Sequence, residues 1–236
     1  MGQSGTGRLV ERLPADLQLQ LKQHMQVFVA EKTFIGCAGL QVTEEMRVVV
    51  AAQACLLLLN RPDAAAYFPK VRQILMYPGA FVVNRRHTDA AGVQQEQREA
   101  LAGESWGEGQ VILSWQDTLD GAATPDDGRN VVIHEFAHQL DQENGRAVGA
   151  PLPMLGDVAY NAARWQRVFA EAYEHLRQQV FMGEQGLLNH YGAQDPAEFF
   201  AVVVEVFFEQ GPALAAAYPA VYAELRGFFR VDPAGW

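Results

Sequence analysis

Residues 131–141 read VVIHEFAHQLD and constrain this chain more than any other segment, because three ionisable side chains interrupt an apolar run. His134, Glu135 and His138 form the pattern H-E-x-x-H. In an α-helix, residues four apart lie on the same face, so both imidazoles can direct a nitrogen at one metal ion. Glu135 lies about 100° round the helix from His134, where it can reach a water beside the ion without binding the ion itself. The segment therefore predicts a metal-binding helix.

A different interpretation is that these side chains only fill the core. Two imidazoles and a carboxylate would then be buried on an apolar helix, and each would need a hydrogen-bond partner because unpaired burial is costly. A catalytic zinc site takes three protein ligands and keeps one position open. If the segment holds zinc, the third ligand must come from another part of the chain.

Residues 195–210 read DPAEFFAVVVEVFFEQ, which predicts a helix that is apolar except for its glutamates. Glu198 and Glu205 are two helical turns apart and so share one face. Glu198, near the N-terminus of this helix, is the predicted third metal ligand. Glu205 is either a group that holds an imidazole N–H or a tyrosine hydroxyl in place, or a carboxylate at the rim of the core. Glu209, at the helix end, is expected to be solvated.

Two further side chains are candidates for the same site. Asp141 follows His138 by one turn, and it either orients a metal ligand or begins the exit of the helix. Tyr191 precedes Glu198 by seven residues. Its phenol is either placed to hydrogen-bond an oxyanion or is a lid on the core. His190, its neighbour, is expected at the surface.

Composition narrows the class of protein. A chain of 236 residues with 49% apolar and 19% charged residues is long enough for one sizeable core and is typical of a globular protein. The formal net charge of -10 disfavours nucleic acid as a partner, because phosphate binding relies on Lys and Arg. The start lacks an apolar signal-peptide core and the longest apolar run, 48–59, is too short to cross a bilayer, so we expect a cytoplasmic protein without a membrane partner.

The pattern along the chain predicts an α+β fold, mostly helical with a small mixed sheet. Helices are expected over residues 14–32, 44–59, 131–141, 157–182, 196–210 and 219–229. Cys37 and Cys55 lack the CxxC spacing of a redox or zinc pair and are expected to be buried free thiols.

The remaining segments predict strands and a loop. Two β-rich runs within 70–83, split by a Pro-Gly pair, predict a hairpin-like pair of strands. Residues 84–109 are polar and predict a long surface excursion, and 109–118 contain the best strand. We expect a disordered tail over 1–7 and a single domain over 8–236. Its helical N-terminal part would reach to about residue 100 and its metal-binding part would cover about 105–236.

The quoted metal-helix segment HEFAHQLD is followed about sixty residues later by DPAEFFAV. In these segments the sequence resembles the Mlc titration factor A family of zinc-dependent peptidases, which belongs to the gluzincin branch of the zincins. The segments FVAEKTFIGCAGLQVTEEMRVVVAAQACLLLL, YPGAFVV and GQVILSW also resemble that family, so the likeness covers most of residues 8–230. The interval from Tyr191 to Glu198 matches lethal-factor-like gluzincins, in which a tyrosine at this place assists catalysis.

The resemblance implies a zincin-like metalloprotease fold and one zinc ion held by His134, His138 and Glu198. It implies Glu135 as the catalytic base and Tyr191 as a second catalytic residue. The implied activity is peptidase, particularly aminopeptidase-like, on a peptide or protein substrate. A glucose-responsive transcriptional repressor is the implied regulatory partner.

The predicted activity is zinc-assisted hydrolysis of peptide bonds, and two alternatives to it stay open. One is a regulatory binding protein that sequesters a repressor while its metal site is structural. The other is a different metal, because two imidazoles and one carboxylate also describe the facial triad of non-haem iron oxygenases. For the peptidase, VILSW is expected as the edge strand that borders the metal helix and pairs with an extended substrate. The loop over 120–130 is expected to cover the cleft.

Overall fold

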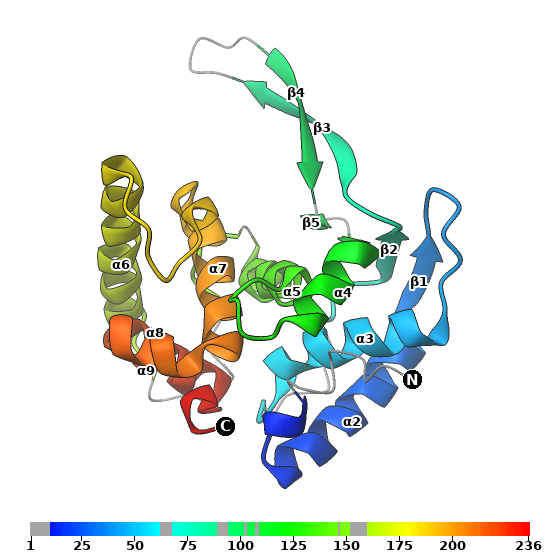
Figure 1. Ribbon diagram of the computed structural model, residues 1–236, viewed down its shortest axis with the longest axis horizontal. Coiled ribbons are helices and arrows are strands. Elements are labelled where there is room, and N and C mark those ends of the chain that lie inside the picture. The colour runs from blue at the N-terminus through cyan, green and yellow to red at the C-terminus, as the bar shows by residue number, and fades with distance from the viewer. Residues whose placement is uncertain are drawn as a thin grey trace.

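In the computed structural model, one helix, α5 (Val131–Asp141), runs between a small sheet and a group of helices (Figure 1). The structure describes residues 10–61, 68–88, 94–101, 103–106, 109–145, 147–151 and 160–236. The tail expected over 1–7 lies outside these residues. The predicted metal helix forms over the expected residues, and its neighbours on both sides decide where its polar face points.

The sheet has four strands in the order β1 (Thr33–Gly36), β2 (Gln73–Tyr77), β6 (Gln110–Ser114) and β5 (Gly103–Trp106). The first three are parallel, and β5 is antiparallel to β6. The fold is thus mostly helical with a small mixed sheet, as predicted. The prediction of VILSW as the edge strand is wrong, because β6 pairs on both sides and β5 forms the edge. Residues 111–114 of β6 are all buried, which is typical of an inner strand covered on both faces.

The predicted hairpin over 70–83 is also wrong. Strand β3 (Phe81–Thr88) pairs antiparallel with β4 (Gln94–Leu101) and not with β2. Both sides of β2 are taken by its parallel neighbours β1 and β6, so no free side is left for β3. Strands β3 and β4 form a two-stranded ribbon that extends away from the helices (Figure 1). The expected surface excursion over 84–109 therefore contains the strands β4 and β5.

The helices predicted from periodicity form, and the structure adds two short helices that were not predicted, over 115–123 and 211–217. Besides α5, they are α2 (Ala15–Glu31), α3 (Glu44–Ala54), α4 (Trp115–Ala123), α6 (Ala162–Met182), α7 (Pro196–Glu209), α8 (Gly211–Ala217) and α9 (Pro219–Phe229). Short 3-10 turns are η1 (Cys55–Leu58), η2 (Gln142–Asn144), η3 (His190–Ala193) and η4 (Pro233–Gly235). The predicted helix over 44–59 is thus α3 followed by η1. Of the helix predicted from residue 157, residues 157–159 lie outside the described residues and α6 begins at Ala162.

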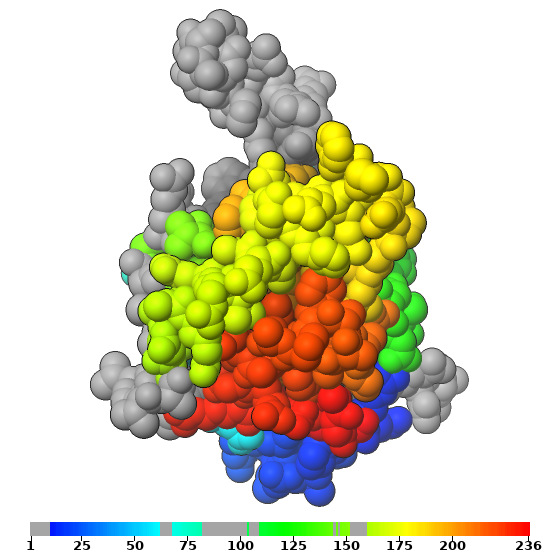
Figure 2. Space-filling view, turned by 90° about the vertical axis from the view of Figure 1, so that its left-hand side faces the viewer, coloured from blue at the N-terminus to red at the C-terminus, as the bar shows by residue number. Residues whose placement is uncertain are grey.

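Helix α7 lies in the interior. Figure 2 shows the face formed by α6, α8 and α9, which cover it. Every residue of α7 from Phe199 to Glu209 is buried. Aromatic side chains fill the space around it, for example Trp165, whose ring stacks on Phe169 at a centroid distance of 4.2 Å. The carboxylates of α7 are consequently carried into the protein and must find partners there.

Neither cysteine forms a disulfide, which confirms the prediction of free thiols, but the prediction that both are buried is wrong for Cys37. Cys37 is half-buried, whereas Cys55 is buried, and burial raises the pKa of its thiol. Across the described ranges, none of the helices combines the length and the apolar character that a bilayer crossing requires.

Candidate metal centre

Helix α5 begins where the sequence provides an N-cap. The side-chain oxygen of Asn130 accepts a hydrogen bond from the backbone N–H of Ile133 at 3.0 Å, which satisfies one of the free donors of the first turn. The apolar side chains of α5 are buried against its neighbours: Val132, Ile133, Phe136, Ala137 and Leu140. With these positions packed into the core, the remaining face of the helix carries His134 and His138 toward α7.

The three predicted ligands meet between α5 and α7. His134 Nε2 lies 3.0 Å from Glu198 Oε2, and His138 Nε2 lies 3.4 Å from the same oxygen. The two histidine Nε2 atoms are 3.2 Å apart. Glu198 stands in the first turn of α7, where the Asp195 side chain accepts hydrogen bonds from the N–H groups of Ala197 at 2.8 Å and Glu198 at 3.0 Å. One N-cap on each helix therefore sets the position of the cluster.

The hydrogen bonds around the three predicted ligands are compatible with a metal ion between them. His134 Nδ1 lies 2.7 Å from Glu205 Oε1, and a carboxylate only accepts, so Nδ1 carries the proton. In the neutral ring, Nε2 then presents a lone pair to Glu198 Oε2, which is a second acceptor. A second proton on the ring or a metal ion between these atoms removes the conflict. Zinc bonds of about 2.0–2.2 Å in a tetrahedron place ligand atoms about 3.4 Å apart, close to the separations found here.

The negative charges of the glutamates also favour a positive charge at the position between the ligands, as two pKa shifts indicate. Burial lowers the pKa of His134, but the charge of Glu205 and the hydrogen bonds to Glu198 and Glu205 outweigh it, so the pKa lies well above its usual value. Burial raises the pKa of Glu198, but its hydrogen bonds with His134 and His138 outweigh that and hold it well below its usual value. The Glu198 carboxylate is therefore ionised, and its negative charge attracts a cation to the site.

A second pair of carboxylates joins α7 to the start of α5. Asn130 donates its backbone N–H to Glu205 Oε2 and its side-chain amide to Glu209 Oε1, the latter at 3.0 Å. The backbone N–H of Arg129 donates to Glu209 Oε2 at 3.0 Å. The expectation that Glu209 is solvated is wrong, since only 4% of it is exposed. Helix α8 continues directly after α7, so the end of α7 does not reach the solvent.

The buried Glu209 gives a prediction for the pH dependence of stability. Burial raises the pKa of Glu209 to about 8 from an ordinary value of 4.5, against the hydrogen bond from Asn130. When the pKa of an acid is higher in the folded than in the unfolded state, its contribution to stability is fully present below the unfolded-state pKa. This contribution is lost as the pH rises through the folded-state pKa. Between about pH 5 and about pH 8, Glu209→Gln should therefore gain thermal stability relative to the original protein.

The measurement is the melting temperature of metal-free protein across this pH range. Glu171→Gln serves as the control, because Glu171 is exposed on α6. Parallel curves for the original protein and Glu209→Gln would contradict the prediction.

Asp141 is buried and bonds to the backbone of a loop. Its carboxylate accepts hydrogen bonds from the N–H groups of Gly149 at 2.6 Å and Ala150 at 2.9 Å. Gly149 has a φ of +73°, and a Cβ there would lie 2.4 Å from the carbonyl oxygen of Pro196, at the start of α7. Asp141 thus holds a loop against the first turn of the helix that carries Glu198. Direct orientation of a ligand by Asp141 stays a prediction.

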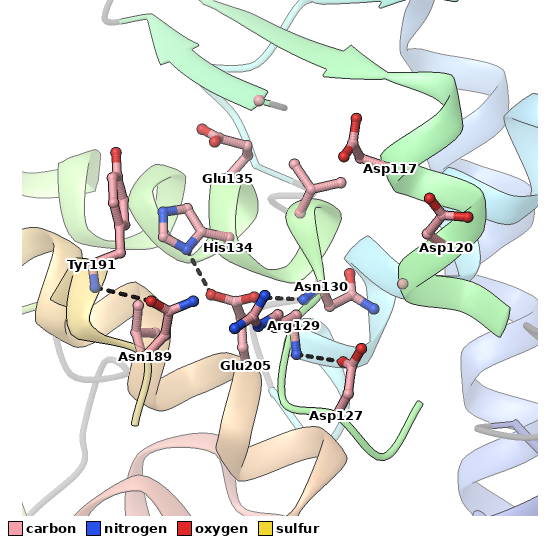
Figure 3. A pocket seen from close by; sticks show the side chains of 14 residues that line it. Asp117, Asp120, Asp127, Arg129, Asn130, His134, Glu135, Asn189, Tyr191 and Glu205 are labelled. Carbon is pink, nitrogen blue, oxygen red and sulfur yellow. Dashed lines mark hydrogen bonds and ion pairs between the residues drawn. The ribbon is translucent and has the colours of Figure 1, made fainter. Parts of the chain in front are cut away.

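Tyr191 lies beside His134, with their ring centroids 5.9 Å apart. Asn189 caps the turn η3 by accepting a hydrogen bond from the N–H of Tyr191 at 3.0 Å. Figure 3 shows the phenol and the Glu135 carboxylate projecting on the same side of the His134 ring. His190 Nε2 instead lies 2.9 Å from the carbonyl oxygen of Glu184. Tyr191 and Glu135 therefore share the space in front of His134.

That space is a cavity of about 400 Å³. It is lined by Gly103, Asp117, Asp120, Gly121, Asp127, Arg129, Asn130, Val131, His134, Glu135, Asn189, Tyr191, Val202 and Glu205 (Figure 3). Asp127, Arg129 and Asn189 also line an adjoining cavity of about 480 Å³. The segment expected as a covering loop over 120–130 instead begins inside α4 and lines one wall. That residues 120–130 cover the cleft stays a prediction.

Sequence reasoning missed several residues of this wall. Asp117 and Asp120 follow the best strand in a stretch with no motif, and α4 turns them toward the cavity (Figure 3). Asn130 carried a usable signal, because an asparagine immediately before a helical apolar run is a favoured N-cap. Gly103 carried none, since it stands in a stretch with no recognisable motif.

Comparison with known proteins adds to this geometry. An uncharacterized protein from Synechocystis sp. is 39% identical over 232 residues, which cover 95% of this chain and 82% of the relative. A Klebsiella pneumoniae protein named Mlc titration factor A is 32% identical over 228 residues, with coverage of 95% and 83%. A protein of the same name from Salmonella typhi matches to the same extent. A family model described as glucose-regulated metallo-peptidase M90 matches residues 5–230, a span that includes the whole cluster. A chain that matches this model over nearly its full length, and gathers two imidazoles and a carboxylate there, belongs to the M90 family of glucose-regulated metallo-peptidases.

Proposed function

We propose that this protein is a zinc-dependent metallopeptidase that hydrolyses peptide bonds in a single zincin-like domain over residues 8–236. One observation carries the proposal: ligand atoms of His134, His138 and Glu198 all lie within 4.8 Å of one another. The metallopeptidase family supports the metal, and the helical H-E-x-x-H pattern with its interposed glutamate favours zinc over iron.

In this mechanism the chain's own residues orient the reactants and move the proton. Zinc, when bound, lowers the pKa of a water and polarises a carbonyl oxygen. Glu135 accepts a proton from the attacking water and returns it to the leaving amine nitrogen. The Tyr191 phenol donates a hydrogen bond to the carbonyl oxygen as it becomes negative. Glu205 keeps the proton of His134 on Nδ1, so the Nε2 lone pair faces the metal position.

An aminopeptidase-like preference is part of the proposal. The cavity wall carries the carboxylates of Asp117, Asp120 and Asp127, which attract a free N-terminal ammonium group. Strand β5 borders the metal helix as the edge of the sheet, where an extended peptide could add as a further strand. The same wall would repel acidic side chains of a substrate.

The test combines metal analysis with a peptide library. Purified protein should contain one zinc ion per chain and should cleave peptides with free N-termini faster than the same peptides after N-acetylation. Stoichiometric iron would overturn the choice of metal. If zinc-loaded protein left every peptide intact, the proposed peptidase activity would be wrong.

A second proposed function is regulatory binding of a transcriptional repressor protein. Its support is the name of two relatives, Mlc titration factor A, and the net charge of -10, which suits a protein partner better than DNA. Glu135→Gln separates the functions, because a pure binding role does not need the base. If Glu135→Gln still binds the repressor, and the original protein cleaves no peptide, the binding function alone would be favoured.

The bridging position of Glu205 gives a further prediction. Glutamine at this position could still accept from His134 Nδ1, but its amide N–H₂ would then face the backbone N–H of Asn130. Mutation of a group that hydrogen-bonds a metal-bound imidazole typically lowers metal affinity by about 10- to 100-fold, and we expect this for Glu205→Gln, which removes the negative charge and strains the bridge to Asn130. Competition with a chromophoric chelator measures the affinity, with Glu171→Gln as the control. Equal affinities of Glu205→Gln and the original protein would show that the bridge does not support the metal.

A further inference from the structure

The first residue of the edge strand lies against the proposed base. A Cβ added to Gly103 would lie 2.6 Å from Glu135 Oε1, 2.7 Å from Glu135 Cγ and 2.7 Å from Val131 Cγ2. Real Cβ atoms essentially never approach other atoms within 3.0 Å. The backbone of β5 and the side chain of Glu135 therefore meet only because position 103 has no side chain.

Backbone conformation does not explain this glycine. The described glycines with a positive φ are Gly39, Gly109, Gly128, Gly145, Gly149 and Gly183. Gly103 is not among them, and it pairs with Leu113 within the antiparallel ladder of β5 and β6. A glycine inside a strand weakens the strand and often marks a close approach of another group. Space for the side chains of α5 is thus the reason for a glycine here.

The surroundings leave little room to relieve a larger side chain. Val131 and Glu135 are one turn apart on the face of α5 toward β5, so an added Cβ would meet both. Rotation of Glu135 would not remove the contact with Val131. The start of α5 is held by the Asn130 cap and by the carboxylates of α7, and β5 is held by its pairing with β6. Glu135, of which 5% is exposed, would have to leave its present rotamer.

We propose that Gly103 is a positioning residue for the Glu135 carboxylate, because the missing side chain sets how closely β5 and α5 approach. This inference rests on the proposed function, in which Glu135 is the base. A base that is displaced by about 1 Å can cost roughly 100-fold in rate, even when substrate and metal still bind.

The first arm of the test uses zinc-loaded protein. Gly103→Ala should lower kcat by about 100-fold with little change in KM and with full zinc content. Gly79→Ala is the matched control, because nothing lies within 4 Å of a Cβ at that position. If Gly103→Ala folds poorly, Gly103→Ala/Val131→Ala removes one of the two contacts and should restore folding but not kcat. A folded, zinc-loaded Gly103→Ala with the original kcat would overturn the proposal.

The second arm needs no activity and uses metal-free protein. Gly103→Ala should lower the melting temperature of the original protein but not that of Val131→Ala/Glu135→Ala, whose shortened side chains leave room for the new Cβ. An equal loss in both backgrounds would overturn the contact itself. If the effect of Gly103→Ala depends on the Val131→Ala/Glu135→Ala background but no zinc-loaded form cleaves peptides, the close approach stands. The proposed function then falls, together with the positioning role of Gly103 in catalysis.

Discussion

Glu135→Gln is expected to abolish peptide cleavage while leaving the metal site filled. Glutamine keeps the shape of the side chain but cannot accept the proton of the attacking water, and loss of a general base typically costs about 10²–10⁴-fold in kcat. None of the three ligand atoms in the cluster comes from Glu135, so the zinc content should stay the same. Cleavage of a fluorogenic peptide and elemental analysis of the same sample measure the two properties together.

The matched control for this experiment is Glu174→Gln. Glu174 lies on α6, and 54% of its side chain is exposed. Peptide cleavage by Glu135→Gln at the rate of the control would show that another group acts as the base. A loss of zinc from Glu135→Gln would instead show that this carboxylate supports the metal site.

Glu198→Ala is expected to remove both the bound zinc and the stabilisation that zinc gives. Only the two imidazoles of α5 would remain, and the ion would lose its one ligand from α7. Ligand binding at about 1,000 times the dissociation constant stabilises a folded protein by about 4.1 kcal/mol. The original protein should therefore melt at a clearly higher temperature with zinc than with a chelator. Glu198→Ala should melt at the same temperature under both conditions.

Calorimetry with and without zinc provides this measurement, and Glu174→Ala is the control. Zinc bound by Glu198→Ala with the original affinity would remove Glu198 from the ligand set. A chelator that changes neither stability nor activity of the original protein would contradict the metal site as a whole.

Local periodicity made much of the metal centre predictable. Four-residue spacing within a helix puts His134 and His138 on one face, and seven-residue spacing does the same for Glu198 and Glu205. The structure places all of these side chains between α5 and α7. Helices repeat every few residues, so a short stretch of sequence already states which side chains share a face.

The errors concern contacts between distant parts of the chain. The Pro-Gly turn after β2 looks like a hairpin turn, but β2 does not pair with the strand that follows it. Its partner later in the chain is β6, which begins more than thirty residues after β2 ends. From the sequence, Glu209 looks like a solvated residue at a helix end. In the structure it is buried, because α8 follows directly and residues 129–130 donate hydrogen bonds to it. Gly103 offers no side chain to recognise, and its importance comes only from what lies opposite. Strand pairing and burial of this kind depend on tertiary structure, which local patterns do not contain.

The hydrogen bonds from residues 129–130 to Glu205 and Glu209 limit how this molecule can change shape. They tie the start of α5 to α7 beside the candidate metal cluster, so we expect these two helices to move together. If the protein is a peptidase as proposed, we expect a widening that admits a bulky polypeptide to occur at the opposite wall of the cavity, where α4 and β5 lie. Mutations that loosen that wall are then expected to broaden the range of accepted substrates without moving His134, His138 and Glu198.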